Sequence, residues 1–276
     1  MIRLDARELA EISGFIKEKY GVNLGEKSTL IEGRLGCYIK SKGFESFGEY
    51  FEYAKTEPTG TEMANLVTRI STNHTFFMRE NDHFEYLARN VLPWVESLPG
   101  GNDLRLWSAG CSTGEEPYGL SIYILEYLRK SGRLKSAFDS IILASDISER
   151  ALSIAAKGIY LHENLLAIPP EWIDAYFTDL GDGSFRVAPE LRANVAFKKI
   201  NLLEPINSSK PYHTIFCRNV MIYFDTETRI TLINRFYDAM APGAWLFVGH
   251  SESLMNYSHN FDYIQPSVYR KPIESP

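Results

Sequence analysis

The run Ser108-Ala109-Gly110-Cys111-Ser112-Thr113-Gly114-Glu115-Glu116 decides the fold of this chain. It follows a short apolar segment over 104–109 and precedes a helical pattern over 116–130. Glycines at such a junction let the backbone turn tightly and approach a ligand closely, and the start of the helix offers free N–H groups. A strand, this turn and a helix indicate either a ligand-binding loop of an α/β sheet or a tight structural turn.

One functional interpretation of the run is a serine hydrolase. Gly-x-Ser-x-Gly between a strand and a helix is the nucleophile elbow of α/β-hydrolases, which makes Ser112 the nucleophile of a serine esterase. Asp225 and His250 follow in the Ser…Asp…His order of that fold. That fold normally builds several strands before its elbow, whereas here the strand is the first of its domain.

The other interpretation is a site for a cationic ligand. Glu115 and Glu116 lie in the first turn of the predicted helix, where acids also serve as simple partners of the helix dipole. A phosphate-binding loop would not place two carboxylates there. S-adenosylmethionine carries an ammonium and a sulfonium, so two carboxylates would attract it.

Outward from this run, short apolar segments alternate with helical patterns. Strands alternating with helices predict a mostly parallel, Rossmann-like α/β sheet that binds its ligand beyond the carboxyl ends of the strands. Residues 160–194 interrupt the alternation, and Leu180-Gly181-Asp182-Gly183 lies there between two short strands, so we expect a small inserted antiparallel β-subdomain. Residues 267–271 are expected to form an edge strand. The other predicted elements are strands over 104–109, 140–145, 195–200, 214–217 and 245–248, and helices over 116–130, 148–157 and 226–240.

The first 75 residues form a helical domain with a linker. Apolar residues recur at helical spacing over 9–20, 27–42 and 46–56. Pro58-Thr59-Gly60 ends the third of these helices. We therefore expect domains over 1–75 and 76–276, the second of which contains the insert.

Composition excludes several classes of protein. A net charge of −6 and a pI near 5.6 argue against a general nucleic-acid binder, which needs a basic face. Cys37, Cys111 and Cys217 are far apart, which fits a reducing compartment and not a CxxC metal site. No signal peptide and no apolar run long enough to span a membrane is apparent, so we expect a cytoplasmic protein that is not inserted in a membrane.

Polar residues close the predicted strands. Asp146 ends the second strand, where an acid can accept both ribose hydroxyls of an adenosine or can cap the next helix. Asn201 ends the third and could hold an adenine amino group, with Leu202 against the ring, although alone it would be a turn residue. Arg218 and Asn219 end the fourth, and a buried arginine must pair or bind.

These segments together resemble the chemotaxis receptor methyltransferases, the CheR family. The matching runs keep the family's order over nearly the whole chain. The resemblance implies a class I S-adenosylmethionine-dependent methyltransferase domain with an N-terminal helical domain and an inserted β-subdomain. The runs are Thr72-Asn73-x-Thr75-x-Phe77-x-Arg79, Trp107–Ala109, Ser112–Tyr118, Ala144–Ile147, Asn201–Glu204, Phe216–Asp225 and Gly249–Glu252.

The resemblance implies methyl transfer from S-adenosylmethionine to glutamate side chains of methyl-accepting chemotaxis proteins, giving glutamate methyl esters and S-adenosylhomocysteine, with no metal. The implied partners are the cytoplasmic methylation helices of chemoreceptors. It places Arg79 and Tyr223 beside the methyl group as catalytic residues. By position, the implied cofactor contacts are Asn73, Thr75, Arg79, Glu116 or Glu115, Asp146, Asn201, Leu202, Arg218 and Asn219.

Two features depart from the family pattern. The turn over Thr178–Ser184 is about three residues shorter than in members that grip a receptor pentapeptide, so tethering to such a peptide is not expected. The helix over 27–42, strongly basic in the family, also carries Glu32, and its positive field is modest. It still suits an acidic receptor helix, mainly through encounter rate.

Overall fold

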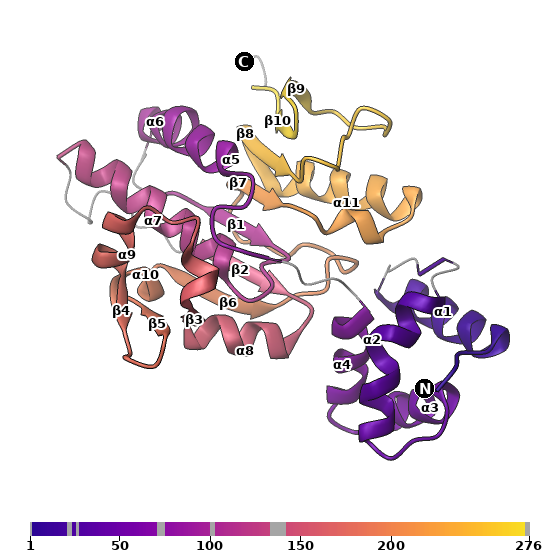
Figure 1. Cartoon of the computed structure of the whole chain (residues 1–276). Helices are drawn as coiled ribbons and strands as arrows, with labels where there is room; N and C mark the ends of the chain where they lie inside the picture. Colours follow the sequence, from indigo (N-terminus) through magenta and orange to yellow (C-terminus); the bar gives the residue numbers. More distant parts are fainter. Residues whose placement is uncertain are drawn as a thin grey trace.

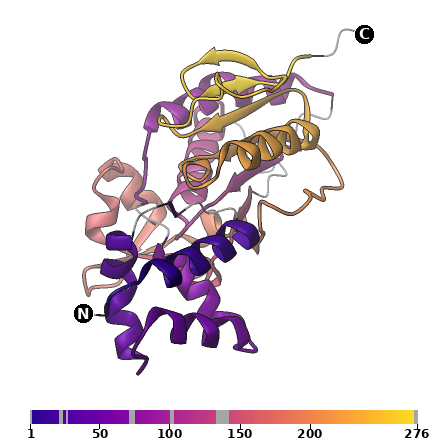
Figure 2. The same cartoon turned by 90° about the vertical axis from the view of Figure 1, so that its right-hand side faces the viewer.

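The computed structural model describes residues 2–20, 24–25, 28–70, 75–99, 103–132 and 142–273. None of the helices in these ranges combines the length and the apolar content needed to cross a bilayer. The first helices form a bundle beside the main sheet (Figure 1, Figure 2). They are α1 (Ala6–Tyr20), α2 (Ser28–Ser41), α3 (Phe47–Thr56) and α4 (Thr61–Ile70).

The fourth helix, α4, was missing from the sequence prediction. Its buried side chains Met63, Leu66, Val67 and Ile70 recur at helical spacing, so the sequence does contain the signal. They join the apolar stripes of the three predicted helices in one core.

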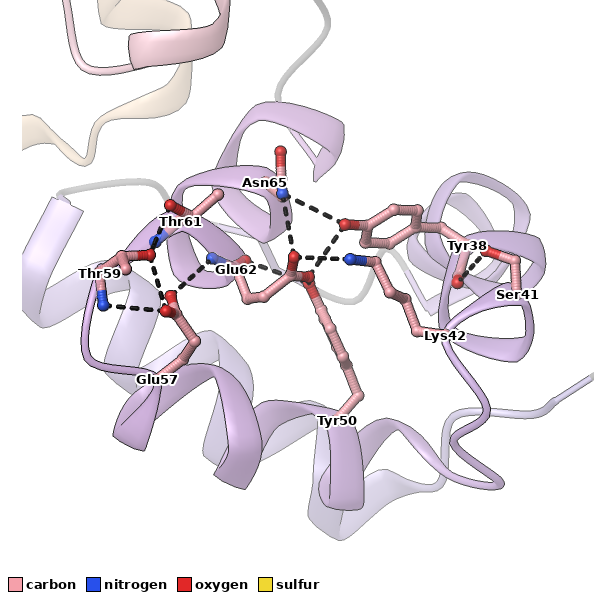
Figure 3. Close-up of polar contacts among 9 residues, drawn as sticks. All are labelled: Tyr38, Ser41, Lys42, Tyr50, Glu57, Thr59, Thr61, Glu62 and Asn65. Atoms are coloured by element: carbon pink, nitrogen blue, oxygen red, sulfur yellow. Dashed lines mark hydrogen bonds and ion pairs between the residues drawn. The ribbon is translucent and has the colours of Figure 1, made fainter.

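A buried carboxylate ties α2, α3 and α4 together. Glu62 accepts hydrogen bonds from the hydroxyls of Tyr38 at 2.9 Å and Tyr50 at 3.1 Å, and from the Lys42 ammonium at 2.9 Å (Figure 3). Burial alone would raise the pKa of Glu62, but these donors hold it below its usual value. Lys42 ends the stretch over 27–42 that was expected to suit an acidic partner, and this cation therefore already has a partner inside the bundle.

The main domain is built on a seven-stranded sheet with the order β6-β2-β1-β7-β8-β10-β9. Strands β6 to β8 in this order run parallel, as predicted, and β10 pairs antiparallel with both β8 and β9. The strands are β1 (Leu106–Ala109), β2 (Ile142–Asp146), β6 (Val195–Lys199), β7 (Tyr212–Cys217), β8 (Met240–Val248), β9 (Asp262–Gln265) and β10 (Val268–Arg270).

The strand predicted over 267–271 is present as β10, but its predicted place at the edge of the sheet was wrong. β10 lies inside the sheet, and the edge is β9, which pairs with it as an antiparallel neighbour. The alternation of β9 is weak because three of its four residues are exposed, so its pattern does not distinguish it from a loop.

Alternate residues of the strands point to opposite faces and form two cores. Trp107, Ile215 and Leu246 pack under α11 on one face, whereas Phe216 and Phe247 pack under α7 and the helices before β1 on the other. The sheet is therefore covered on both sides, as expected for βαβ units. The covering helices are α5 (Asn81–Tyr86), the π-helical segment η1 (Leu87–Val91), α6 (Leu92–Ser97), α7 (Glu115–Lys130), α8 (Glu149–Lys157) and α11 (Thr226–Ala239).

The insert is a three-stranded antiparallel sheet in the order β3-β5-β4. The hairpin β4–β5 was predicted, and β3 adds a strand to it. The Tyr160 ring of β3 meets Phe77 edge-on at 4.9 Å between centroids, which anchors the insert to the main domain. Its elements are β3 (Ile159–Leu161), η3 (His162–Leu165), α9 (Pro170–Tyr176), β4 (Phe177–Asp179), β5 (Ser184–Val187) and α10 (Pro189–Ala193).

Candidate functional site

The candidate site lies at the carboxyl edge of the sheet, where the connections from neighbouring strands β1 and β7 run to opposite faces. β1 leads into α7, and β7 leads through the short helix η4 (Met221–Tyr223) to α11. Such a switch point opens a crevice beyond the strand ends. The arrowheads of β1 and β2 point toward the N-terminal bundle (Figure 1), which contributes Tyr20 and Val67 to the wall of this crevice.

Two glycines shape the loop after β1. Gly110 has φ +88°, and a Cβ there would lie 2.3 Å from Cγ2 of Val220. Gly114 has φ +97°, and a Cβ there would lie 2.8 Å from the Cβ of Ala155 and 2.9 Å from the hydroxyl of Tyr160. Both positions require glycine because of their backbone angle and their close neighbours, which explains the spacing of the motif.

The crevice is a cleft of about 1080 Å³, including its open mouth. Pockets for small ligands and cofactors typically measure about 300–1,000 Å³, so the cleft has room for a ligand of nucleoside dimensions. Nine of the predicted site residues line it, and they come from the loops after β1, β2, β6 and β7 and from the segment before α5. They are Thr75, Arg79, Glu116, Asp146, Asn201, Leu202, Arg218, Asn219 and Tyr223.

Asp146 lies at the end of β2 with each carboxylate oxygen on a backbone donor. Oδ2 accepts from Ser112 N at 2.9 Å, and Oδ1 accepts from Ser148 N at 2.8 Å. The N-cap of α8 is Ser148, whose hydroxyl accepts from Ala151 N at 3.2 Å. Asp146 is thus not needed as the cap, and its oxygens keep lone pairs for a ligand. Burial raises the pKa of Asp146.

The two glutamates that start α7 have different surroundings. Glu116 lines the cleft, accepts from the Ser108 hydroxyl at 2.6 Å and pairs with Arg218 at 3.1 Å. Glu115 is buried outside the lining and accepts from the Thr113 hydroxyl at 2.8 Å. Burial raises the pKa of both carboxyls. The geometry favours Glu116 as the residue that faces a ligand.

Arg218 is buried and is held by two carboxylates and a carbonyl. Its guanidinium donates to Glu80 at 3.1 and 3.2 Å, to Glu116 at 3.1 Å and to the Arg79 carbonyl. Burial alone would raise the pKa of Glu80, but Arg218 holds it below its usual value. The expectation that a buried arginine must pair is confirmed, and Glu80 is a partner that the sequence analysis did not assign.

A second unassigned acid, Glu252, lies behind the loop after β7. It is 7% exposed and accepts the backbone N–H groups of Asn219, Ile222 and Gly249. The sequence signal was its place in the run Gly249–Glu252, but nothing in that run predicts which backbone donors it meets.

Asn201 lines the cleft but also has neighbours within the protein. Its Oδ1 accepts from Leu203 N at 3.0 Å, as in an Asx turn, and its Nδ2 donates to the carbonyl of Lys19 at 3.4 Å. Asn201 therefore does act as a turn residue, one of the two roles expected from the sequence. Leu202 beside it is 8% exposed and lines the same wall.

The segment before α5 carries Thr75 and Arg79 into the cleft. Residues 77–80 form a turn in which Met78 and Glu80 have φ of +60° and +53°. The turn, and not an α-helical face, brings the two side chains to the site. Asn73, also predicted here, lies outside the described residues.

The hydrolase triad is not assembled. Asp225 caps α11 through Thr228 N at 3.0 Å and pairs with Lys17 at 3.0 Å. His250 lies 3.2 Å from Asp82, and neither it nor Asp225 lines the cleft that contains Ser112. The nucleophile interpretation of Ser112 therefore lacks its base.

One group within the described ranges has metal-ligand chemistry, formed by Glu80, His83 and His250. The Glu80 oxygen nearest to His83 already accepts two guanidinium N–H groups from Arg218. A divalent cation there would face that guanidinium at close range. Arg218 already compensates the charge of Glu80, so these three residues do not require a metal ion.

The cleft fits a polar ligand with positive charge. The Ser112 hydroxyl is buried and has no hydrogen-bond partner among the described residues. Glu116 and Asp146 place two carboxylates in the wall, against the cations Arg79 and Arg218, and Glu80 adds a third carboxylate directly behind it. These residues suit S-adenosylmethionine better than a phosphate or an uncharged substrate.

Comparisons with known proteins agree over nearly the whole chain. Residues 7–71 match the model "CheR methyltransferase, all-alpha domain", and residues 73–270 match "CheR methyltransferase, SAM binding domain". The chain is 38% identical over 275 residues to a chemotaxis protein methyltransferase of Borreliella burgdorferi, covering 98% of this chain and 96% of that one. It is 35% identical over 265 residues to chemotaxis protein methyltransferase 1 of Pseudomonas aeruginosa, covering 93% and 94%.

Proposed function

The chain belongs to the CheR methyltransferase family, and from this premise we propose that it transfers the methyl group of S-adenosylmethionine to glutamate side chains of chemoreceptors. Family membership makes it an S-adenosylmethionine-dependent chemotaxis protein methyltransferase. The proposal adds the acceptor, the products, which are a glutamate methyl ester and S-adenosylhomocysteine, and the residues. The main support for the proposal is that the carboxylates of Glu116 and Asp146 line one cleft at the switch point of the sheet.

We propose that the cleft binds S-adenosylmethionine along the carboxyl edge of the sheet. Asp146 accepts the ribose hydroxyls with the lone pairs that Ser112 N and Ser148 N leave free. Asn201 and Leu202 hold the adenine, and the side of the cleft with Glu116 and Arg218 holds the amino-acid end. Thr75, Arg79, Asn219 and Asn73 complete the proposed contacts, and no metal takes part.

The chemistry needs no general base. A glutamate carboxylate has an unperturbed pKa of about 4.3 and is ionised at neutral pH. S-adenosylmethionine supplies a methyl group on a sulfonium, which a carboxylate oxygen can displace in line. Carboxylate and sulfonium charges disappear together, so a strong cation on the attacking oxygens would stabilise the ground state more than the transition state.

Arg79 and Tyr223 therefore act chiefly by positioning. Both line the cleft, from the segment before α5 and from η4. Holding the acceptor in a near-attack geometry lowers the entropy cost of the step. Arg79→Ala and Tyr223→Phe are expected to lower turnover without unfolding the protein, and wild-type rates in both variants would contradict the assignment.

We propose that the acceptor is a methylation helix in the cytoplasmic part of a chemoreceptor. The basic helix α2 is the proposed encounter surface, although Arg34 donates to the Ile70 carbonyl at 2.6 Å and Lys42 pairs with Glu62. Lys40 is exposed on α2 and no described residue pairs with it, so we expect the positive field of this helix to be weak. The short β4–β5 turn argues against tethering to a receptor pentapeptide.

Radiolabel transfer tests the proposal. The protein is incubated with methyl-labelled S-adenosylmethionine and receptor-bearing membranes, and base-labile label on the receptor is measured. The expected result is labelled methyl ester on the receptor with wild-type protein and a large loss with Asp146→Ala. Label on another acceptor, or cofactor turnover that leaves the receptor unlabelled, would overturn the glutamate assignment. Absence of cofactor binding by calorimetry would indicate a receptor-binding scaffold.

A further inference from the structure

Two loops meet behind the cleft around a single buried carboxylate. Oε2 of Glu252 accepts from Asn219 N at 2.6 Å and from Gly249 N at 2.7 Å, and Oε1 accepts from Ile222 N at 3.1 Å. The donors come from the loop after β7 and from the residue after β8. No Lys, Arg or His within the described ranges pairs with this carboxylate, so backbone N–H groups alone compensate it.

The residues that Glu252 fixes are next to the proposed cofactor and acceptor contacts. Asn219 has a left-handed backbone, with φ +58°, and its amide side chain donates to Glu80 at 3.4 Å. A non-glycine residue holds this conformation only when its surroundings support it, and the bond from its own N–H to Glu252 does so. Ile222, the second anchor, directly precedes Tyr223.

The junction leaves no room for a different arrangement. A Cβ at Gly249 would lie 2.4 Å from Nδ2 of Asn219 and 2.8 Å from Oε2 of Glu252. The carboxylate, the glycine and the asparagine are thus packed against one another. A displacement of Glu252 must move the asparagine that lines the cleft.

We infer that Glu252 is a positioning residue for methyl transfer: its carboxylate holds Asn219 in the cofactor cleft and sets the place of Tyr223 at the methyl group. This inference rests on the proposed function, since that function gives Asn219 and Tyr223 their roles. Glu252 itself does not line the cleft, so it acts through the two loops. A carboxylate is suited to the task because charged acceptors bind N–H groups more strongly than neutral ones do.

Glu252→Gln is the test variant, because it keeps the size of the side chain and replaces one acceptor oxygen by an amide that cannot accept. Losing one bond to a charged acceptor is expected to weaken S-adenosylhomocysteine binding about tenfold in calorimetry, and turnover at saturating cofactor should fall as well. Glu252→Asp keeps the charge and is expected to recover part of both. Measurements are made at a temperature at which calorimetric melting shows every variant to be folded.

Glu126→Gln is the matched control. Glu126 is 4% exposed and accepts from Tyr176 at 2.8 Å and Arg129 at 2.7 Å, but it lies ten residues beyond Glu116 on α7. That is about 15 Å along the helix. It should lower the melting temperature and leave cofactor affinity unchanged, which separates a general loss of stability from a loss of positioning.

Double variants with Asn219→Ala test whether Glu252 acts through Asn219. If Glu252 acts through Asn219, the loss of affinity in Glu252→Gln/Asn219→Ala is smaller than the sum of the single losses, whereas Glu126→Gln/Asn219→Ala is additive. Wild-type affinity and turnover in folded Glu252→Gln, or additivity with Asn219→Ala, would overturn the inference. If neither Glu252 variant folds, the carboxylate is a determinant of folding and the positioning role is rejected. A wild-type protein that binds no S-adenosylhomocysteine would instead count against the proposed function.

Discussion

Replacing Arg218 by methionine tests the charge balance behind the cleft. The Arg218 side chain is 2% exposed, and its guanidinium makes hydrogen bonds to Glu80, Glu116 and the carbonyl of Arg79. Methionine keeps a flexible chain of similar length but leaves both carboxylates without their cation. Removing one partner of a buried ion pair typically costs about 3–5 kcal/mol, so we expect a loss of that size in the free energy of unfolding. For a chain of this length that is roughly 6–10 °C in melting temperature.

The pH dependence of this stability loss tests the charge balance more specifically than its size does. Arg218 now holds the pKa of Glu80 below its usual value against the effect of burial. Without the guanidinium, burial is opposed by the smaller effects of His250 and Asn219, and we expect the folded pKa of Glu80 to rise above the unfolded one. The folded variant then binds more protons than the unfolded chain, so its deficit is largest at high pH and shrinks as the pH falls toward the carboxyl range.

Urea unfolding of wild type and Arg218→Met at pH 5.5 to 8.5 measures this deficit. Adding Glu80→Gln removes one uncompensated charge and should recover at least about 1 kcal/mol of it, because the two sites are coupled. Arg218→Lys is the matched control that keeps a positive charge. An unfolding free energy of Arg218→Met within about 1 kcal/mol of wild type would refute the reasoning. So would a deficit that is independent of pH and additive with Glu80→Gln.

Three further changes have defined outcomes. Gly110→Ala places a Cβ 2.3 Å from Val220 at φ +88°, so it should cost about 2–5 kcal/mol of stability. It should also weaken S-adenosylhomocysteine binding in calorimetry, and adding Val220→Ala should recover part of both losses. Asp146→Asn should weaken S-adenosylhomocysteine binding at least about tenfold. Because burial raises the pKa of Asp146, the affinity of wild type should fall on acidification, whereas the affinity of the variant should not change with pH. Asp225→Asn should lower the melting temperature, since Thr228 and Lys17 lower the pKa of Asp225 to about 2. The deficit is present above the ordinary pKa of 3.8 and vanishes as the pH falls through about 2.

Much of the sheet could be predicted because its signals are local. The alternation of apolar runs and helical patterns gave five parallel strands, and the glycine spacing around Gly110 gave the loop at the switch point. Polar residues at strand ends, such as Asp146 and Arg218, were expected to share one edge, and they do line one cleft. These predictions depend only on the period of each element and on parallel strands ending at a common edge.

The rest depends on contacts between distant segments. One partner of Arg218 is Glu80, 138 residues away, and the backbone donors to Glu252 lie in two separate loops. No spacing rule connects such positions. The segment of Arg79 is a turn with left-handed residues, which a four-residue interval cannot distinguish from a helix. Strand β9 was missed because exposed residues do not alternate.

Charge balance explains the place of Glu116, the second of the two acids at the start of α7, whereas Glu115 is buried outside the cleft and accepts from Thr113. Arg218 closes the floor of the cleft but would leave a buried positive charge, so Glu80 and Glu116 must be there to compensate it. With Asp146 and Arg79, three carboxylates and two guanidiniums leave a net negative charge at the site. A ligand with an ammonium, a sulfonium and one carboxylate matches that charge, whereas the product, which has lost the sulfonium, does not. We therefore expect the carboxylates that hold Arg218 in place to favour the methyl donor over the spent product. Neutralising Glu116 should then narrow the difference between the two affinities, which calorimetry with each ligand measures.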